Sequence, residues 1–265
     1  MTTSLRAAEA SEEFHAPGPA DFELPAIFTV GGFDFTKPML VIVLGTVFLA
    51  VLLYYVAGRS SVVPGRLQFA VEGVYGFVRN GIAADAIGRE GLKYVPYLFT
   101  LFVFIAVLNV AGIIPVLQFP ATSKIAIPLF LAIISWAIFN YVGIRRQGLG
   151  GYFKNMMFPS GVPAWLYPLL APLEFLSTFV FRPITLTLRL TFNMFAGHLV
   201  LLLTILGGEY LLFHTQGVVG YAAGSVSLLF SIVLTFFEGF IQVLQAYVFT
   251  LLSAIYIGGA LIHEH

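Results

Sequence analysis

Long apolar segments constrain the fold of this chain more than any other feature of its sequence. A helix needs about 20 residues to cross the ~30 Å hydrocarbon core of a bilayer, and five apolar segments of the chain approach or exceed this length. Only 10% of its 265 residues are charged and 59% are hydrophobic, whereas charged residues make up about a quarter of a typical soluble domain. The sequence therefore predicts an all-α, polytopic integral membrane protein.

Three of the predicted spans have ordinary lengths, and the last two are about twice as long. Their predicted bounds are 39–57, 94–119, 125–144, 164–206 and 221–262. Each of the last two would measure ~60 Å as a single helix. That length alone permits two spans in each, but no charged turn divides either segment. We therefore expect two long, tilted or bent helices, and because they are consecutive we expect them to pack as an antiparallel hairpin.

Two segments outside these spans have a different character. Residues 1–38 carry six acidic and two basic side chains, which indicates an acidic arm ahead of a single membrane domain at 39–265. In 62–90, apolar residues recur at steps of three and four while charged residues interrupt the run, a pattern typical of a helix with one apolar face. This pattern favours an amphipathic helix in the membrane interface. A soluble helix packed on a partner subunit is the alternative.

Lysine and arginine lie unevenly around the five spans. If the amino terminus is outside, eight of these residues fall in the inner segments and three in the outer ones. Because cytoplasmic loops carry the excess of basic residues, the sequence predicts an external amino terminus and a cytoplasmic carboxyl terminus.

Arg189 lies near the middle of the first long segment, with leucine-rich sequence on both sides. Arginine stays protonated in proteins, so this residue places a permanent charge where hydrocarbon is expected. That placement costs from ~3 to more than ~10 kcal/mol and usually marks function. The alternative is a side chain that reaches the interface from a helix end, a description that fits Arg182. Asn193 and His198 follow in the same segment, and this accumulation of polar residues favours a functional site.

The second long segment has a polar set of its own, Glu238, Gln242 and Gln245. The spacing i, i+4, i+7 puts the three on one helix face, which favours a hydrated path, while a purely structural role is the alternative. In an antiparallel hairpin, the position numbers of two residues that face each other add up to a nearly constant sum. Three pairs of polar residues give nearly the same sum, so all three fit one register. The pairs are Arg189 with Gln245, Asn193 with Gln242, and His198 with Glu238.

Helical spacing places His198 nearly opposite Arg189 around the helix axis, so both side chains cannot face the same partner helix. We expect Arg189 to point toward something beyond this chain and His198 toward a water-filled cavity. An unperturbed histidine titrates near pH ~6.5, so His198 and Glu238 are predicted to form a proton-accepting pair. A histidine held in one protonation state by its partner is the alternative.

Several classes of site are not indicated by the sequence. The chain has no cysteine, which excludes disulfides, thiolate catalysis and thiolate metal ligands. We find no histidine and carboxylate spacing typical of a metal site, no phosphate-binding loop and no nucleophile with a base, so we expect no catalytic residue, metal or cofactor. The net charge is zero and gives no indication of nucleic acid binding.

Two segments resemble subunit a of the F-type ATP synthase. Arg182-Pro183 followed by LRLTFNMFAGH at 188–198 is similar to the signature helix of that family, and QVLQAYVFTLLSAIY at 242–256 is similar to its last helix. The order of hydrophobic segments fits nearly all of the rest. Weaker similarities are Asn109-x-x-Gly112-x-x-Pro115 and Pro64-Gly65-x-x-Gln68-x-x-x-Glu72.

The resemblance implies a membrane subunit that is not an enzyme by itself and belongs to a complex in the bacterial plasma membrane. Its implied partners are a rotating ring of small proteolipid c subunits, each with one ionisable carboxylate, and peripheral-stalk b subunits. Arg189 matches the essential arginine of the family. Asn193 and Gln245 match its polar neighbours, and Gln242 lies one turn from Gln245. Many bacterial members have the His198 and Glu238 residue types exchanged, and the arrangement in this chain is that of mitochondrial-type members.

A family member of this kind is expected to translocate protons through two offset half-channels separated by Arg189. Protons would enter from outside past His198 and Glu238, and leave to the inside along a second path for which Glu174 and Ser177 are candidates. The alternative is a self-contained secondary transporter that uses Arg189 to bind an anionic substrate. Such a transporter predicts inverted repeats, and we find no convincing internal repeat.

Overall fold

The computed structural model describes residues 16–18, 28–30, 33–59, 61–114, 121–158, 164–215 and 217–261. Most of this part of the chain is helical, which confirms the predicted all-α class. Five helical segments within it are long and apolar enough, by length and composition, to cross a membrane: Lys37–Gly58, Arg89–Val110, Ala126–Met157, Tyr167–Phe213 and Val218–Leu261.

The stretch before the first span contains a small antiparallel hairpin. Its strands are β1 (Phe28–Val30) and β2 (Phe33–Phe35), and Thr29 pairs with Asp34. Most of the predicted acidic arm at 1–38 lies outside the described residues.

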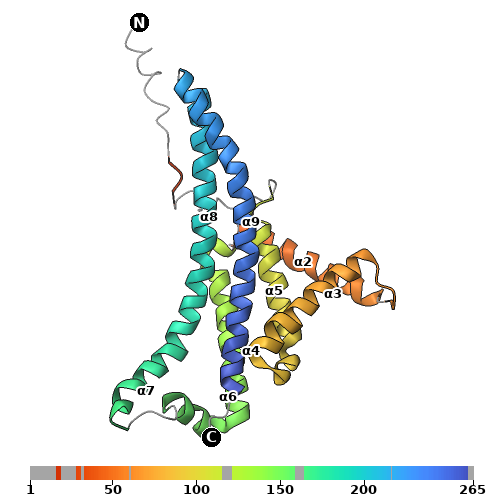
Figure 1. Ribbon diagram of the computed structural model, residues 1–265, viewed down its shortest axis with the longest axis vertical. Helices are drawn as coiled ribbons and strands as arrows, with labels where there is room; N and C mark the ends of the chain where they lie inside the picture. Colours follow the sequence, from red (N-terminus) through yellow and green to blue (C-terminus); the bar gives the residue numbers. More distant parts are fainter. Residues whose placement is uncertain are drawn as a thin grey trace.

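The two long carboxyl-terminal segments form an antiparallel helical hairpin, as the sequence predicts. Figure 1 shows α8 (Arg182–Phe213) and α9 (Val218–Leu261) side by side along the longest axis of the molecule. Among the elements that the structure describes, these two helices share the most extensive interface. At its amino-terminal end α8 continues from α7 (Tyr167–Leu176) through a π-helical turn, η6 (Ser177–Phe181). Such turns are a recognised cause of bends, and α7 leans away from α9 (Figure 1).

The helix α8 extends seven residues beyond its predicted end at 206, because small residues let it remain in contact with α9. A Cβ atom added to Gly224 would lie 2.8 Å from the main-chain oxygen of Gly208. Helices whose main chains approach this closely need glycine or another small residue at the contact. The glycines of this region, which resemble a turn in the sequence, therefore serve helix packing.

Two further helices pack against the hairpin, α5 (Val95–Val110) and α6 (Ala126–Met157). The core that they share with α8 and α9 includes the fully buried Leu98, Ile105, Leu190 and Phe249. The predicted second span, 94–119, runs past the end of α5, and its residues 115–119 lie outside the described part.

The helix α6 continues past its predicted end at 144 and is interrupted only at Gly148, whose φ of +74° suits glycine. Beyond that break the chain comes back against the first part of α6. There the Tyr152 hydroxyl donates a hydrogen bond of 2.9 Å to Asn140 Oδ1. Gln147 Nε2 also donates to the Ala260 main-chain oxygen at 3.1 Å. These contacts with other parts of the fold stabilise the additional turns.

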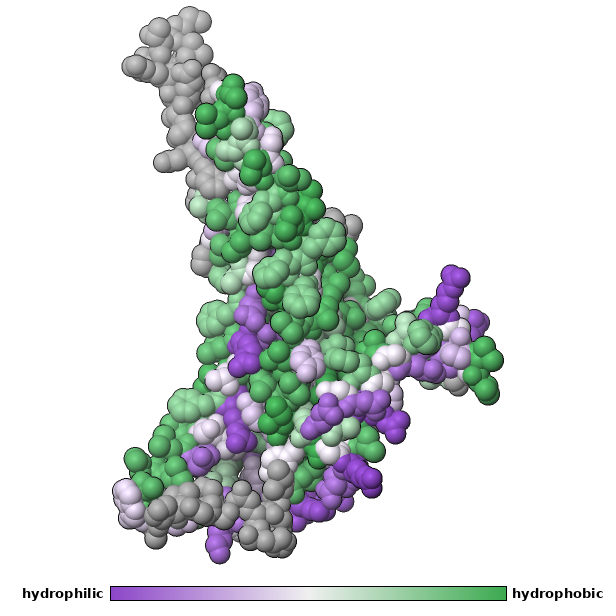
Figure 2. Space-filling view, in the orientation of Figure 1, coloured by the Kyte–Doolittle hydropathy of each residue, from purple (hydrophilic) through white to green (hydrophobic). Residues whose placement is uncertain are grey.

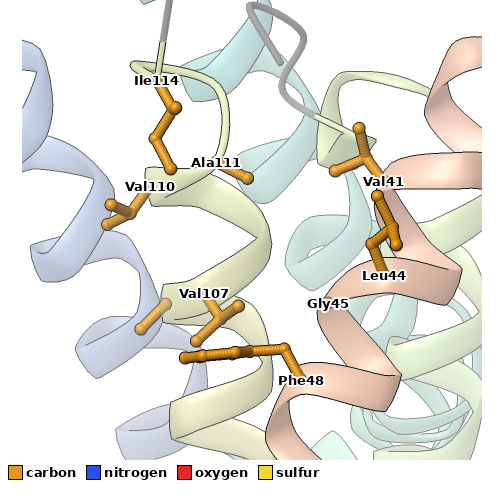
Figure 3. A pocket seen from close by; sticks show the side chains of 9 residues that line it. Val41, Leu44, Gly45, Phe48, Val107, Val110, Ala111 and Ile114 are labelled. Atoms are coloured by element: carbon orange, nitrogen blue, oxygen red, sulfur yellow. The ribbon is translucent and has the colours of Figure 1, made fainter. Parts of the chain in front are cut away.

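The amino-terminal helices lie at the side of this bundle. The helix α2 (Lys37–Gly58) contacts α5, and a wholly apolar groove of about 440 Å³ lies between them (Figure 3). The helix α3 (Arg66–Val78) continues through η2 (Arg79–Ala84) and α4 (Asp85–Ile87), and α3 projects sideways in Figure 1. This region matches the helix predicted at 62–90, whose position in the membrane interface stays a prediction.

We expect a disulfide between cysteines placed at Gly208 and Ser227 to link α8 to α9. A Cβ atom on residue 208 would lie 3.2 Å from the Cβ atom of Ser227, and disulfides join Cβ atoms about 3.8 Å apart. With a protease site inserted in the turn between the helices, the two fragments of the Gly208→Cys, Ser227→Cys variant should stay linked after cleavage under oxidising conditions.

The matched control pairs Gly208→Cys with Leu234→Cys, seven residues or about 10 Å farther along α9. Its fragments should separate on a denaturing gel. Equal linkage in the two variants would contradict the register of the hairpin.

Candidate functional site

Arg189 lies on the outer face of α8. Its side chain is exposed, whereas Leu186 and Leu190 on the adjoining face are 1% and 0% exposed. Two contacts between oppositely chargeable groups occur in the described residues, Arg146 with Glu90 and His198 with Glu238, and neither involves Arg189. Figure 2 shows that a few hydrophilic patches interrupt the largely apolar surface over α8. The predicted direction of Arg189, away from its own chain, agrees with this exposure.

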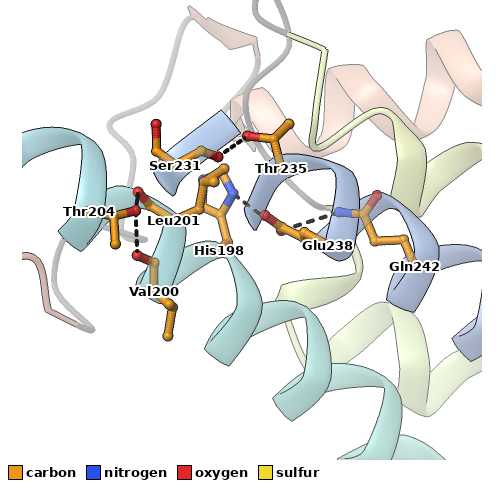
Figure 4. Close-up of polar contacts among 8 residues, drawn as sticks. All are labelled: His198, Val200, Leu201, Thr204, Ser231, Thr235, Glu238 and Gln242. Carbon is orange, nitrogen blue, oxygen red and sulfur yellow. Dashed lines mark hydrogen bonds and ion pairs between the residues drawn. The ribbon is translucent and has the colours of Figure 1, made fainter. Parts of the chain in front are cut away.

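His198 and Glu238 meet inside the hairpin, as the register predicts. His198 Nδ1 lies 3.9 Å from Glu238 Oε1, and the two side chains are 8% and 7% exposed. Figure 4 shows them extending toward each other from α8 and α9. Gly197 of α8 lies beside the carboxylate, since a Cβ atom built there would be 3.6 Å from Glu238 Oε1, in ordinary van der Waals contact. The 3.9 Å distance is just beyond hydrogen-bond reach, so a shift of less than about 1 Å would let an acid and an imidazole pass a proton between them.

Gln242 extends this pair toward α5. Its Nε2 atom donates a 3.3 Å hydrogen bond to Glu238 Oε1 (Figure 4). Its main-chain oxygen accepts a 3.2 Å hydrogen bond from Asn109 Nδ2, and Asn109 Oδ1 accepts one of 2.7 Å from the Thr122 hydroxyl. All three of these side chains are fully buried. The polar group thus joins α8, α9, α5 and the short turn η4 (Ala121–Ser123).

Two of the predicted polar pairs are wrong. Asn193 Nδ2 donates a 2.7 Å hydrogen bond to Gln245 Oε1, so its partner is Gln245 rather than Gln242. Gln245 therefore does not pair with Arg189, which faces outward. A constant sum of position numbers describes two straight, parallel axes, and it ignores the rotation of side chains around each helix. Gln242 is turned toward α5 by this rotation.

Some buried polar atoms of this group have no hydrogen-bond partner within the described part of the chain. They are Glu238 Oε2, Gln242 Oε1 and Gln245 Nε2. Buried polar atoms are nearly always satisfied by protein or by ordered water. Three such atoms along one face of α9 therefore favour a hydrated path beside this helix.

The two residues predicted for the inner path, Glu174 and Ser177, belong to α7 and η6 rather than to α8 and α9. Glu174 in α7 and Ser177 in η6 are partly buried, on the amino-terminal side of Arg189. Nearer the carboxyl-terminal end of α9 there is a separate hydroxyl cluster that could not be predicted from the sequence. The Tyr97 and Ser135 hydroxyls are 2.6 Å apart, and Ser253 Oγ donates to Ser135 Oγ at 3.2 Å.

Asn109 and Thr122 were also missed as members of the site. Asn109 had a signal in the sequence, because an amide stands out in an apolar span. Thr122 had none, because its position beside Asn109 is decided by the fold. No group of three histidine, cysteine or carboxylate side chains in the described ranges could hold a metal ion.

Comparisons with known proteins identify a family and several relatives that this chain resembles. Residues 39–258 match the family model described as ATP synthase A chain. A protein named ATP synthase subunit a from Nocardioides sp. is 47% identical over 98% of this chain and 98% of its own length. Proteins of the same name from Frankia alni and Pseudarthrobacter chlorophenolicus are 44% and 46% identical. They cover 97% and 96% of this chain, and 89% and 96% of their own lengths.

Proposed function

The chain belongs to the ATP synthase A chain family, and from this premise we propose that it is the proton-translocating stator subunit of a rotary ATP synthase. In this role it is a membrane subunit of the complex and not an enzyme by itself. Five helices of the described residues that are long and apolar enough to cross a membrane, together with bacterial relatives, support a location in the bacterial plasma membrane. The excess of lysine and arginine in alternate connections supports an external amino terminus and a cytoplasmic carboxyl terminus.

The observation that carries this proposal is the position of Arg189. Its side chain is exposed on α8 and forms no ion pair with any residue that the structure describes. A permanent cation at membrane depth is stabilised by a counter-charge or by water. A carboxylate on a neighbouring ring of small proteolipid c subunits would supply that counter-charge. Peripheral-stalk b subunits would hold the chain still against the ring.

The buried polar group supports an outer half-channel. A proton from outside would pass His198 and Glu238, which are 3.9 Å apart, and protonate a ring carboxylate. The carboxyl group, now neutral, can face lipid at low cost. Asn193 and Gln245, joined by a 2.7 Å hydrogen bond, lie between this pair and the level of Arg189.

Arg189 would separate the outer path from an inner one. Its charge favours the ionised form of any carboxylate that passes, so the proton must be released before that point, and it repels a proton that would cross directly. Glu174 and Ser177 are the candidates for release to the inside. Each charge moved through the membrane potential provides ~2.3 kcal/mol per 100 mV, which biases the direction of rotation.

The test of this proposal is reconstitution. Proteoliposomes that contain this chain with its ring should conduct protons when a potential is applied, and the chain purified gently from membranes should bring the ring with it. Proteoliposomes with the chain alone should conduct none. Uptake of an anionic solute by the chain alone would instead show a self-contained transporter and contradict the proposal.

A further inference from the structure

We infer that Asn109 and Thr122 are positioning residues for the Glu238 carboxyl group. In this arrangement Thr122 orients the Asn109 amide, and Asn109 holds α9 at Gln242, one helical turn from Glu238. The inference rests on the function proposed above. It assigns to α5 and to the turn η4 a part in proton transfer, although neither Asn109 nor Thr122 lies on the proton path itself.

The first step is the contact between Asn109 and α9. Asn109 Nδ2 donates to the main-chain oxygen of Gln242 at 3.2 Å, and both residues are fully buried. A carbonyl oxygen has two lone pairs, so the Gln242 oxygen can accept this bond and still accept the bond of its own helix. The contact therefore joins α5 to α9 without interrupting α9.

The second step is the orientation of the Asn109 amide. The Thr122 hydroxyl donates to Asn109 Oδ1 at 2.7 Å, and Thr122 is fully buried. Were the amide turned round, Oδ1 would face the Gln242 carbonyl oxygen, with an acceptor against an acceptor. Thr122 thus favours the one orientation in which Asn109 can donate to α9.

The third step connects Gln242 with the proton-accepting pair. Gln242 Nε2 donates to Glu238 Oε1 at 3.3 Å, and the same oxygen lies 3.9 Å from His198 Nδ1. Hydrogen bonds weaken steeply as their geometry departs from the optimum. Both distances are already long, so a small displacement of α9 at Gln242 is enough to separate the Glu238 carboxyl group from one of its partners.

The experiment uses the whole ATP synthase in inverted membrane vesicles and measures the initial rate of ATP-driven proton pumping, normalised to assembled complex. Thr122→Val removes the hydroxyl at nearly constant size and should lower the rate about two- to tenfold, the range expected for one net hydrogen bond. Thr122→Ser keeps the hydroxyl and should restore a rate close to that of the wild type. If Thr122→Val does not assemble, Thr122→Ala makes the same deletion with less bulk and should give the same loss.

A double mutant shows whether Thr122 acts through Asn109. Asn109→Leu should lower the rate at least as much as Thr122→Val, and the variant with both changes should be no slower than Asn109→Leu alone. Thr187→Val is the matched control. Thr187 is equally buried, but its hydroxyl donates to the Pro183 oxygen of its own helix at 2.8 Å, so its removal should leave the rate within about twofold of the wild type.

Three results would overturn the positioning role: pumping by Thr122→Val at the wild-type rate, equal losses in the valine and serine variants, or losses that multiply in the double mutant. Glu238→Ala, measured alongside, distinguishes this failure from that of the proposed function. If Glu238→Ala pumps like the wild type, the outer path through His198 and Glu238 is wrong and the positioning role falls with it. If only the Thr122 variants behave like the wild type, the outer path stands and the positioning role alone is overturned.

Discussion

Replacing Arg189 by alanine is expected to abolish coupled ATP synthesis while the chain still inserts and assembles. Arg189 is exposed on α8 beside the buried Leu186 and Leu190, so the substitution leaves the packed core intact and removes only the outward charge. A nearby opposite charge favours an ionised carboxylate by up to about 4 kcal/mol, so removing this cation corresponds to a loss of up to about 1,000-fold. The measurement is ATP synthesis by vesicles energised with a proton gradient.

Arg189→Lys is expected to fail almost as completely. A lysine can lose its proton where water is scarce, and it lacks the planar group that binds a carboxylate through two hydrogen bonds. If the lysine variant keeps near-normal pumping, a permanent planar cation is not required at this position.

Arg182→Ala is the matched control for the Arg189 variants. Arg182 lies on the same face of α8, seven residues earlier, and its guanidinium carbon is 4.9 Å from the centre of the Tyr256 ring. Because this cation is already engaged with an aromatic ring of its own chain, its loss should cost the energy of a cation–π contact. That energy corresponds to a decrease of about two- to thirtyfold, smaller than the loss on replacing Arg189. Equal losses in both alanine variants would show a general need for positive charge on this face.

Exchanging the residues of the buried pair is expected to recover activity that either single change destroys. His198→Glu alone puts two acids at a site where the partners are 3.9 Å apart, and Glu238→His alone puts two imidazoles there. Each should slow proton pumping by roughly tenfold or more, because proton relay groups contribute roughly 100-fold or more to such steps. The double exchange restores one acid and one imidazole across the same gap.

The double-mutant cycle of pumping rates measures the coupling between the two positions. The three variants should be compared at equal amounts of assembled complex. A double exchange that is no better than the worse single change would show that His198 and Glu238 do not act as a pair. The outer path would then have to be sought at other residues.

The main elements of the fold could be predicted because membrane-spanning helices depend on local sequence. In hydrocarbon every main-chain polar group must be satisfied within the segment itself, so an apolar segment of sufficient length predicts a helix without knowledge of its neighbours. The same rule applies to the two segments that became α8 and α9, whose length and lack of a charged turn predict two long helices. The small hairpin of β1 and β2 was not predicted, and within the membrane helices the errors lie at helix ends. There, Gly208 and the region around Gly148 resemble turns until their contacts with other helices are known.

The members of the candidate site could be predicted for a related reason. A charge or an amide is costly in hydrocarbon, so Arg189, His198, Glu238, Gln242 and Gln245 stand out in apolar segments whatever the fold. Their assignment to a proton path remains a proposal.

The tertiary structure decided which side chains of the candidate site pair with one another. The sequence brought His198 and Glu238 together correctly, but it paired Asn193 with Gln242 where the fold pairs it with Gln245. It gave no sign that Thr122 would lie beside Asn109, or that Asn109 would hold α9. Which elements are helices is determined by local segments and by the cost of polar groups in hydrocarbon. Which side chains meet depends on how the helices rotate and approach one another, and that is set by packing between residues far apart in the chain.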